Sequence, residues 1–156
     1  MKLSSNFSLE ELIKSQVAER KGINNNPSPA QIENLKLLCE NILQPCRDHF
    51  GKVLTVSSGF RSAELCIAIG SSIESQHCAD DGSSACDFEL FGIDNKEVAD
   101  WVHKNTPTDQ VILEFYKEGQ PNSGWVHASY NKNESRKQYL IAYREDGRTK
   151  YKPKLD

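Results

Sequence analysis

The chain has 156 residues and a formal net charge of −3, which suits a single domain spanning residues 1–156 with a hydrophobic core of its own. This nearly balanced charge does not predict the basic face of nucleic-acid-binding proteins, so we expect no nucleic-acid partner. No apolar run reaches the roughly 20 residues of a membrane span, and the amino-terminal residues lack the apolar stretch of a secretory signal. We therefore expect a soluble monomer that is cytoplasmic as synthesised.

Two helix start signals lie in the first third of the chain. A capping box at Ser8 and Glu11 predicts a short helix that ends before Gly22. Residues 28–31 give a second signal, with serine at the N-cap, proline in the first turn and glutamine at N3. Pro45 is expected to bend or break this second helix. Its buried stripe is predicted to comprise Ile32, Leu35, Leu38, Cys39, Ile42, Leu43 and Cys46.

After Gly51 the pattern changes to that of strands. The sequence predicts a strand at 53–56, a loop that carries Arg61, and a short helix at 62–69. A polar loop at 74–84 precedes a strand at 85–90, a helix at 94–105, strands at 110–115, 125–130 and 138–144, and a loose tail over about 145–156. Helices first and strands later indicate an α+β domain, with amino-terminal helices packed on a mostly antiparallel sheet.

Three separate segments carry side chains that bind metals in proteins, namely His77, Asp87 and His127. Two imidazoles and one carboxylate suit Zn²⁺ and leave a fourth coordination position for water. Asp87 is the most informative of the three, because a carboxylate inside an apolar strand is costly unless a cation or hydrogen bonds compensate it. A salt bridge with Arg61 would meet the same need, so the pattern alone leaves both interpretations open.

Six blocks follow one another along the chain: 57–62 (Ser-Ser-Gly-Phe-Arg-Ser), 75–77 (Ser-Gln-His), Gly82, 85–89 (Ala-Cys-Asp-Phe-Glu), 109–114 (Asp-Gln-Val-Ile-Leu-Glu) and 125–130 (Trp-Val-His-Ala-Ser-Tyr). Together they resemble the zinc D-Ala-D-Ala carboxypeptidase family, and most of all its small, phage-type, endolysin-like branch. The likeness runs from about Phe7 to Tyr130. It implies the Hedgehog/DD-peptidase fold and a zinc ion held by His77, Asp87 and His127.

One spacing departs from the pattern of that family. Nine residues separate His77 from Asp87, where the family usually has six. Three extra loop residues cost little closure entropy, so we expect both side chains to reach one metal ion. The acidic pair at 80–81 is interpreted as part of a solvated loop. Cys78 and Cys86 offer thiolates as alternative ligands, although a regular strand would point Cys86 away from Asp87.

The cysteines are five in number, so at least one cannot form an internal disulfide. Without an export signal, we expect reduced thiols. Cys39 and Cys46 lie seven positions apart in a helical pattern, which is typical of small core residues.

Peptide hydrolysis needs a base that accepts a proton from water and returns it to the leaving amine. Many relatives have an acidic residue three positions before the last histidine ligand, but this chain has Gly124 there, followed by Trp125. Glu114, at the end of the predicted 110–115 strand, is the candidate base. Its alternatives are a carboxylate that orients a histidine ligand or an exposed residue at a strand edge.

Arg61 is expected to reach into a cleft, where its guanidinium would bind a substrate carboxylate or stabilise an oxyanion. The alternative is a structural ion pair with Asp87 or Glu89. Three further residues are expected to line the substrate site, Ser75, Gln110 and Trp125, although an aromatic residue on a strand is often simply part of the core.

These features predict a zinc metallopeptidase that cleaves peptidoglycan stem peptides, as a D-Ala-D-Ala carboxypeptidase or an L-alanyl-D-glutamate endopeptidase. The resemblance implies phage lysis or cell-wall remodelling, with action on the wall after release from an infected host cell. Two alternatives stay open: a zinc-stabilised peptidoglycan-binding module without turnover, and a structural domain without a metal.

Overall fold

The structure is a computed structural model that describes residues 1–154. Its helices are α1 (Leu9–Ile13), α2 (Gln16–Lys21), α3 (Pro29–Leu38), the π-helix η1 (Cys39–Leu43), α4 (Gln44–Phe50), α5 (Ala63–Ala68), the 3₁₀-helix η2 (Gln76–Cys78) and α6 (Asn95–Asn105). Its strands are β1 (Lys2–Ser4), β2 (Phe7–Ser8), β3 (Thr55–Ser58), β4 (Ser83–Glu89), β5 (Gln110–Glu114), β6 (Trp125–Asn131), β7 (Gln138–Glu145) and β8 (Arg148–Pro153).

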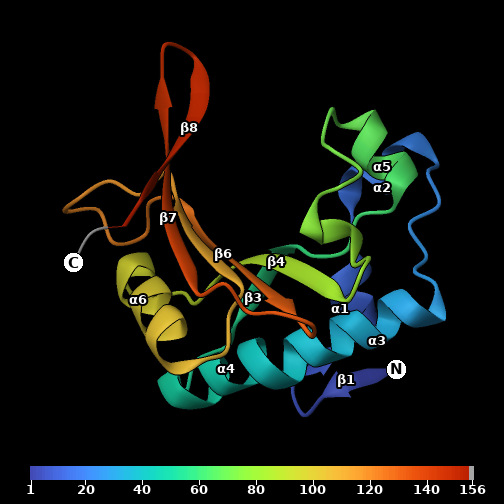
Figure 1. Cartoon of the computed structure of the whole chain (residues 1–156), viewed down its shortest axis with the longest axis horizontal. Coiled ribbons are helices and arrows are strands. Elements are labelled where there is room, and N and C mark those ends of the chain that lie inside the picture. Colours follow the sequence, from blue (N-terminus) through green and yellow to red (C-terminus); the bar gives the residue numbers. More distant parts are fainter. Residues whose placement is uncertain (155–156) are drawn as a thin grey trace.

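Six of these strands form one sheet, and the longer helices pack along it (Figure 1). The strand order is β3-β4-β6-β5-β7-β8, and all neighbours are antiparallel except β5 and β7. α3 packs against β4 and β6, and α6 packs against β5 and β6. The predicted α+β class with a mostly antiparallel sheet is therefore confirmed. In the described part of the chain, no helix has the length and apolar character to cross a membrane.

Alternation along the central strands separates the core from the opposite face of the sheet. On β4, Cys86 and Phe88 belong to the core beneath the helices, so Asp87 between them points to the other face. The same alternation turns His127 of β6 and Glu114 of β5 to that face, because their neighbours along each strand are core residues. The polar face of the sheet is therefore where functional side chains gather.

The predicted helix starts are confirmed, but the first predicted helix is in fact two helices. The capping boxes at Ser8 and Ser28 are both present. Ser15 then begins α2 as a new helix, because its Oγ accepts a hydrogen bond from the Ala18 N–H. Gly22 ends α2 in the left-handed conformation, as its position predicts.

The break expected at Pro45 takes the form of a π turn. Proline has no N–H to donate to the Asn41 carbonyl one turn earlier, so the regular series of α-helical hydrogen bonds is interrupted there. The backbone widens instead, and the Gln44 N–H donates to the carbonyl oxygen of Cys39. Cys39 and Cys46 on either side are fully buried in the core, as the sequence predicts.

The strand expected at 53–56 lies two residues further along the chain. Pairing with β4 begins at Thr55, opposite Glu89, whereas Val53 is exposed. This shift includes Ser58 in β3 and brings Arg61 close to the edge of the sheet. The other predicted helices and strands between 62 and 145 match the structure to within two residues at each end.

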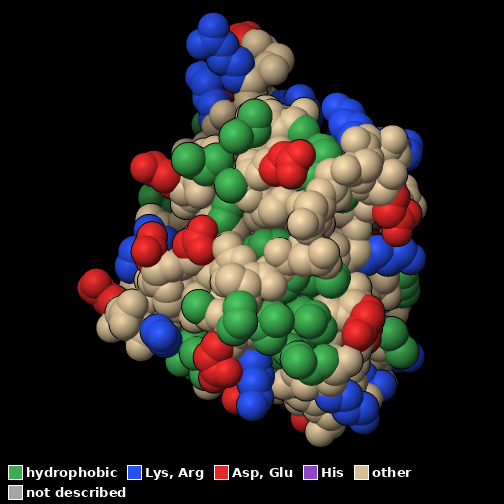
Figure 2. All heavy atoms as spheres, turned by 90° about the vertical axis from the view of Figure 1, so that its right-hand side faces the viewer, with side chains coloured by type: hydrophobic (Ala, Val, Ile, Leu, Met, Phe, Trp, Pro, Cys, Tyr) green, Lys and Arg blue, Asp and Glu red, His purple; other side chains and the backbone are tan. Residues whose placement is uncertain are grey.

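The carboxy-terminal segment is not the loose tail that we expected. Residues 148–153 form β8, which pairs with β7 in a regular hairpin. Asp146 and Gly147 join the two strands with φ values of 53° and 75°, as in the two-residue turns that match the twist of paired strands. Figure 2 shows the hairpin tip projecting from the body, with Lys and Arg side chains gathered on it. Residues 155–156 of the expected tail lie outside the described residues.

Gly124, just before β6, occupies a position that no side chain can take. Its φ is +64°, and a Cβ built there would lie 1.8 Å from the carbonyl oxygen of Glu114. The acidic residue that the family resemblance leads one to expect at this position is therefore excluded by the backbone of β5.

We expect Gly124→Ala to lower the free energy of unfolding by about 3 kcal/mol or more, because a backbone clash adds to the cost of the left-handed conformation. Gly119→Ala is the matched control: its φ is +80°, but nothing lies within 4 Å of a Cβ there. That variant should lose only about 1 kcal/mol. Urea unfolding of both variants measures the difference, and equal losses would contradict the steric argument.

Candidate metal centre

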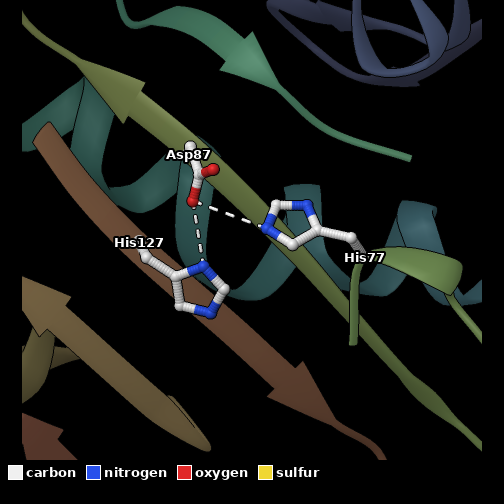
Figure 3. A group of neighbouring side chains, drawn as sticks. All are labelled: His77, Asp87 and His127. Atoms are coloured by element: carbon white, nitrogen blue, oxygen red, sulfur yellow. Dashed lines mark hydrogen bonds and ion pairs between the residues drawn. The ribbon is translucent and has the colours of Figure 1, made fainter. Parts of the chain in front are cut away.

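His77, Asp87 and His127 come together on the polar face of the sheet, although three separate elements carry them (Figure 3). Asp87 on β4 and His127 on β6 are directly opposite each other in the strand register. Oδ1 of Asp87 lies 2.9 Å from Nδ1 of His127 and 3.5 Å from Nε2 of His77. One ligand atom from each residue lies within 4.8 Å of the other two, as expected of groups that share one ion.

Backbone groups fix the orientation of the His77 ring. Its Nδ1–H donates to the carbonyl oxygen of Gly59 at 2.7 Å, which leaves Nε2 facing the other two side chains. Ser75 Oγ accepts a hydrogen bond from the His77 N–H, and the Arg61 N–H donates to the His77 carbonyl oxygen. Gly59 has no space for a side chain, because a Cβ there would lie 2.3 Å from the Leu12 carbonyl oxygen.

All three residues are buried, with His77 5%, Asp87 7% and His127 8% exposed. Burial lowers the pKa of His77, which keeps its imidazole neutral and free to bind a metal. Burial alone would raise the pKa of Asp87, but the hydrogen bond from His127, together with the nearby His77, outweighs it and holds that pKa below its ordinary range. Two imidazoles and an ionised carboxylate form a donor set that fits Zn²⁺.

Arg61 forms the ion pair that the sequence left open as a structural alternative. Its Nη2 lies 3.6 Å from Oδ2 of Asp87, so the partner is Asp87 rather than Glu89. Its Nε donates to Ser58 Oγ at 3.1 Å. The Arg61 side chain is still 19% exposed and lines the cavity over the metal-binding residues, so the ion pair leaves part of this side chain accessible to a ligand.

A cavity of about 400 Å³ opens over the three metal-binding residues. This volume lies in the range of ligand sites that bury most of a small molecule. The walls include every residue that the sequence assigned to catalysis or substrate binding: Arg61, Ser75, Gln110, Glu114 and Trp125. The structure thus brings all of these residues together around one cavity.

Glu114 lies at the end of β5, which is a central strand and not an edge. Its Oε2 accepts a hydrogen bond from the indole N–H of Trp125, its partner across the strands. Burial, followed by the negative charge of Asp87, raises the pKa of Glu114. The hydrogen bond of Glu114 thus goes to an indole and not to a histidine, which leaves its second carboxylate oxygen to the cavity.

Trp125 lines the cavity and is not part of the core. Its ring lies 5.3 Å from that of Phe115, measured between centroids. Gln110 also faces the cavity, where its amide donates to the side chain of Gln138.

Sequence reasoning missed a buried network that holds η2 in place. Asp109 is 1% exposed and accepts a hydrogen bond at 2.7 Å from the amide of Gln76, the neighbour of His77. Arg136 forms an ion pair with the same carboxylate at 2.8 Å. The network ties the turn that carries His77 to the start of β5. Asp109 lies in one of the motif blocks, but its partner at 136 is remote in the sequence and gave no signal.

Tyr151 also lines the cavity, from the segment that we expected to be a loose tail. The Asp146-Gly147 dipeptide was the available signal, because it is the strongest short-range indicator of a hairpin. It predicts the turn but not the position of β8 beside the site.

The thiolate alternatives do not occur in the described structure. Cys86 is fully buried in the core, where burial raises the pKa of its thiol. Cys78 Sγ lies 3.3 Å from Cys66 Sγ and outside the metal-binding cluster. The acidic pair is solvated, as predicted: Asp80 and Asp81 are exposed.

A family model described as peptidase M15 matches residues 5–128, which is well over half of the chain. No curated protein matches the sequence. M15 peptidases depend on a metal, and the buried cluster of two histidines and one aspartate fits that requirement. Because the match covers well over half of the sequence, the chain belongs to the peptidase M15 family.

Proposed function

We propose that this chain is a zinc-dependent peptidase that hydrolyses the stem peptides of bacterial peptidoglycan. The observation that carries the proposal is the buried cluster of His77, Asp87 and His127 at a cavity that also presents Glu114 and Arg61. A metallopeptidase needs a metal, a base and a group that stabilises negative charge, and candidates for all three line this cavity.

His77, Asp87 and His127 would hold the zinc ion, which when bound polarises a carbonyl and lowers the pKa of water to roughly 7. Glu114 would accept a proton and deliver it to the leaving amine, a role that a raised carboxyl pKa favours. Arg61 would bind a substrate carboxylate or stabilise developing negative charge. The remaining lining residues, Ser75, Gln110 and Trp125, would hold the peptide in register.

The choice of substrate rests on the resemblance of six sequence blocks to the zinc D-Ala-D-Ala carboxypeptidase family. Relatives of that kind cleave either the terminal D-Ala-D-Ala bond or the L-alanyl-D-glutamate bond. We place the activity in phage lysis or cell-wall remodelling, by a monomer that reaches the wall after release from an infected host cell.

A second candidate function is favoured by Gly124. Because an acidic residue cannot occupy that position, a zinc-stabilised module that binds peptidoglycan without turnover is consistent with the same site.

Digestion of purified sacculi separates the two functions. Zinc-loaded protein should release new amino termini, a chelator should abolish the release, and mass spectrometry of the muropeptides should identify the bond. Binding to sacculi without any new amine would favour the binding module. A protein that takes up no stoichiometric zinc by elemental analysis would overturn both.

His127→Ala should lose both stoichiometric zinc and muropeptide hydrolysis, because only two of the three protein ligands would remain. Elemental analysis and the digestion assay measure the two losses. His49→Ala is the control, since His49 is exposed and stacks on Trp101 away from the site. Retention of zinc by the His127 variant would remove this residue from the ligand set.

Glu114→Gln should retain zinc and lower kcat by on the order of 10² or more, because an amide cannot accept the proton. Glu118→Gln, at an exposed residue that pairs with Lys96, should leave kcat unchanged. Steady-state kinetics and zinc analysis of both variants check the expectation. Normal turnover in the Glu114 variant would exclude this residue as the base.

A further inference from the structure

The β7–β8 hairpin adds a wall to the cavity from outside the residues that the family model matches. That match ends at residue 128, whereas Tyr151 of β8 lines the cavity together with the metal-binding residues. Tyr151 is therefore a part of the site that lies outside both the motif blocks and the residues matched by the family model.

The strand register explains why Tyr151 faces the metal centre. Glu114 of β5 lies opposite Trp125 on one side and beside Ala142 of β7 on the other. Ala142 in turn lies opposite Tyr151. Residues aligned across neighbouring strands point to the same face of a sheet, so one row carries the indole, the carboxylate, the alanine and the phenol.

The residue between Glu114 and Tyr151 is Ala142, whose side chain is a single methyl group. Ala142 is 1% exposed, and its methyl group leaves the space above it to its larger neighbours. A bulky side chain there would separate the phenol from the carboxylate. The short side chain instead makes the row continuous, and it extends the polar part of the cavity from β5 to β8.

The hydroxyl of Tyr151 is available to a ligand. The residue is 54% exposed, and among the described residues no protein group makes a hydrogen bond to its hydroxyl. Burial, followed by the negative charges of Glu114 and Asp87, raises the pKa of Tyr151. The phenol is therefore protonated at neutral pH and can donate a hydrogen bond.

We infer that Tyr151 contacts the substrate: its hydroxyl donates to a carbonyl oxygen of the bound peptide, and its ring forms the β8 wall of the cavity. This inference rests on the proposed function, since the peptide is the substrate proposed above. No proton leaves the phenol in this role, so Glu114 remains the only proposed proton acceptor.

Two substitutions separate the hydroxyl from the ring. Tyr151→Phe should lower kcat/KM for purified muropeptides about five- to tenfold, which corresponds to one neutral hydrogen bond. Tyr151→Ala should lower it further, mainly through a higher KM, because the wall is lost as well. Tyr143→Phe is the matched control: it lies on the opposite face of the same hairpin, opposite Lys150 and beneath the Lys152 ammonium. It should behave as wild type.

Equal kcat/KM for wild type and Tyr151→Phe, with the hairpin intact by thermal melting, would overturn the inference. If the wild-type protein does not hydrolyse muropeptides, the proposed function fails separately. Calorimetric titration of the zinc-loaded protein with the same muropeptides then tests whether Tyr151 contacts the bound peptide. Weaker binding by Tyr151→Ala than by Tyr143→Phe supports it, and equal binding by both variants overturns it.

Discussion

The structure depends on one costly feature, the ionised carboxylate of Asp87 within a buried strand. Such a charge is tolerated only where hydrogen bonds and opposite charges compensate it. Here His127 across the strand pair donates a hydrogen bond and the Arg61 guanidinium supplies a positive charge, while His77 from a separate turn lies beside the same carboxylate. Each of these groups is held by its own backbone contacts, so the site is a consequence of how several elements are fixed around one anion.

The sheet supplies the rigid part of this arrangement. β4 and β6 place Asp87 and His127 opposite each other, and β5 adds Glu114 two residues along the same face. Side chains on paired strands keep their spacing because the ladder fixes the backbone. The close approach of Gly124 to the Glu114 carbonyl has a further consequence. No carboxylate can therefore stand just before β6, and Glu114 on β5 is the acidic residue that lines the cavity beside Asp87.

The third metal-binding residue depends on a loop, and the loop is secured by contacts of its own. His77 lies in a short 3₁₀ turn that is tied to Gly59 through its ring and to Asp109 through its neighbour Gln76. In the longer segment that follows, Asp80 and Asp81 are exposed. Extra residues in such a loop cost little entropy, so the longer spacing between His77 and Asp87 is compatible with one shared site.

Much of the fold was predictable, because its signals are local. Capping boxes, the proline in the long helix and the alternation on β4–β7 each act within a few residues, and the structure has them where they were predicted. The errors were also local. Ser15 starts a second helix that the periodicity concealed, and the pairing partner of β3 moved its start to Thr55.

The sequence by itself determined the α+β class, most of the secondary structure and the residue types of a metal site, because propensity and periodicity are properties of short segments. Only the tertiary structure decided which of these groups meet. The ion pair of Arg61 with Asp87, the Asp109–Arg136 network and the approach of Tyr151 to Glu114 join residues that are 26 to 37 positions apart. Their proximity follows from strand order and register, which depend on packing across the whole sheet and leave no short-range pattern in the chain.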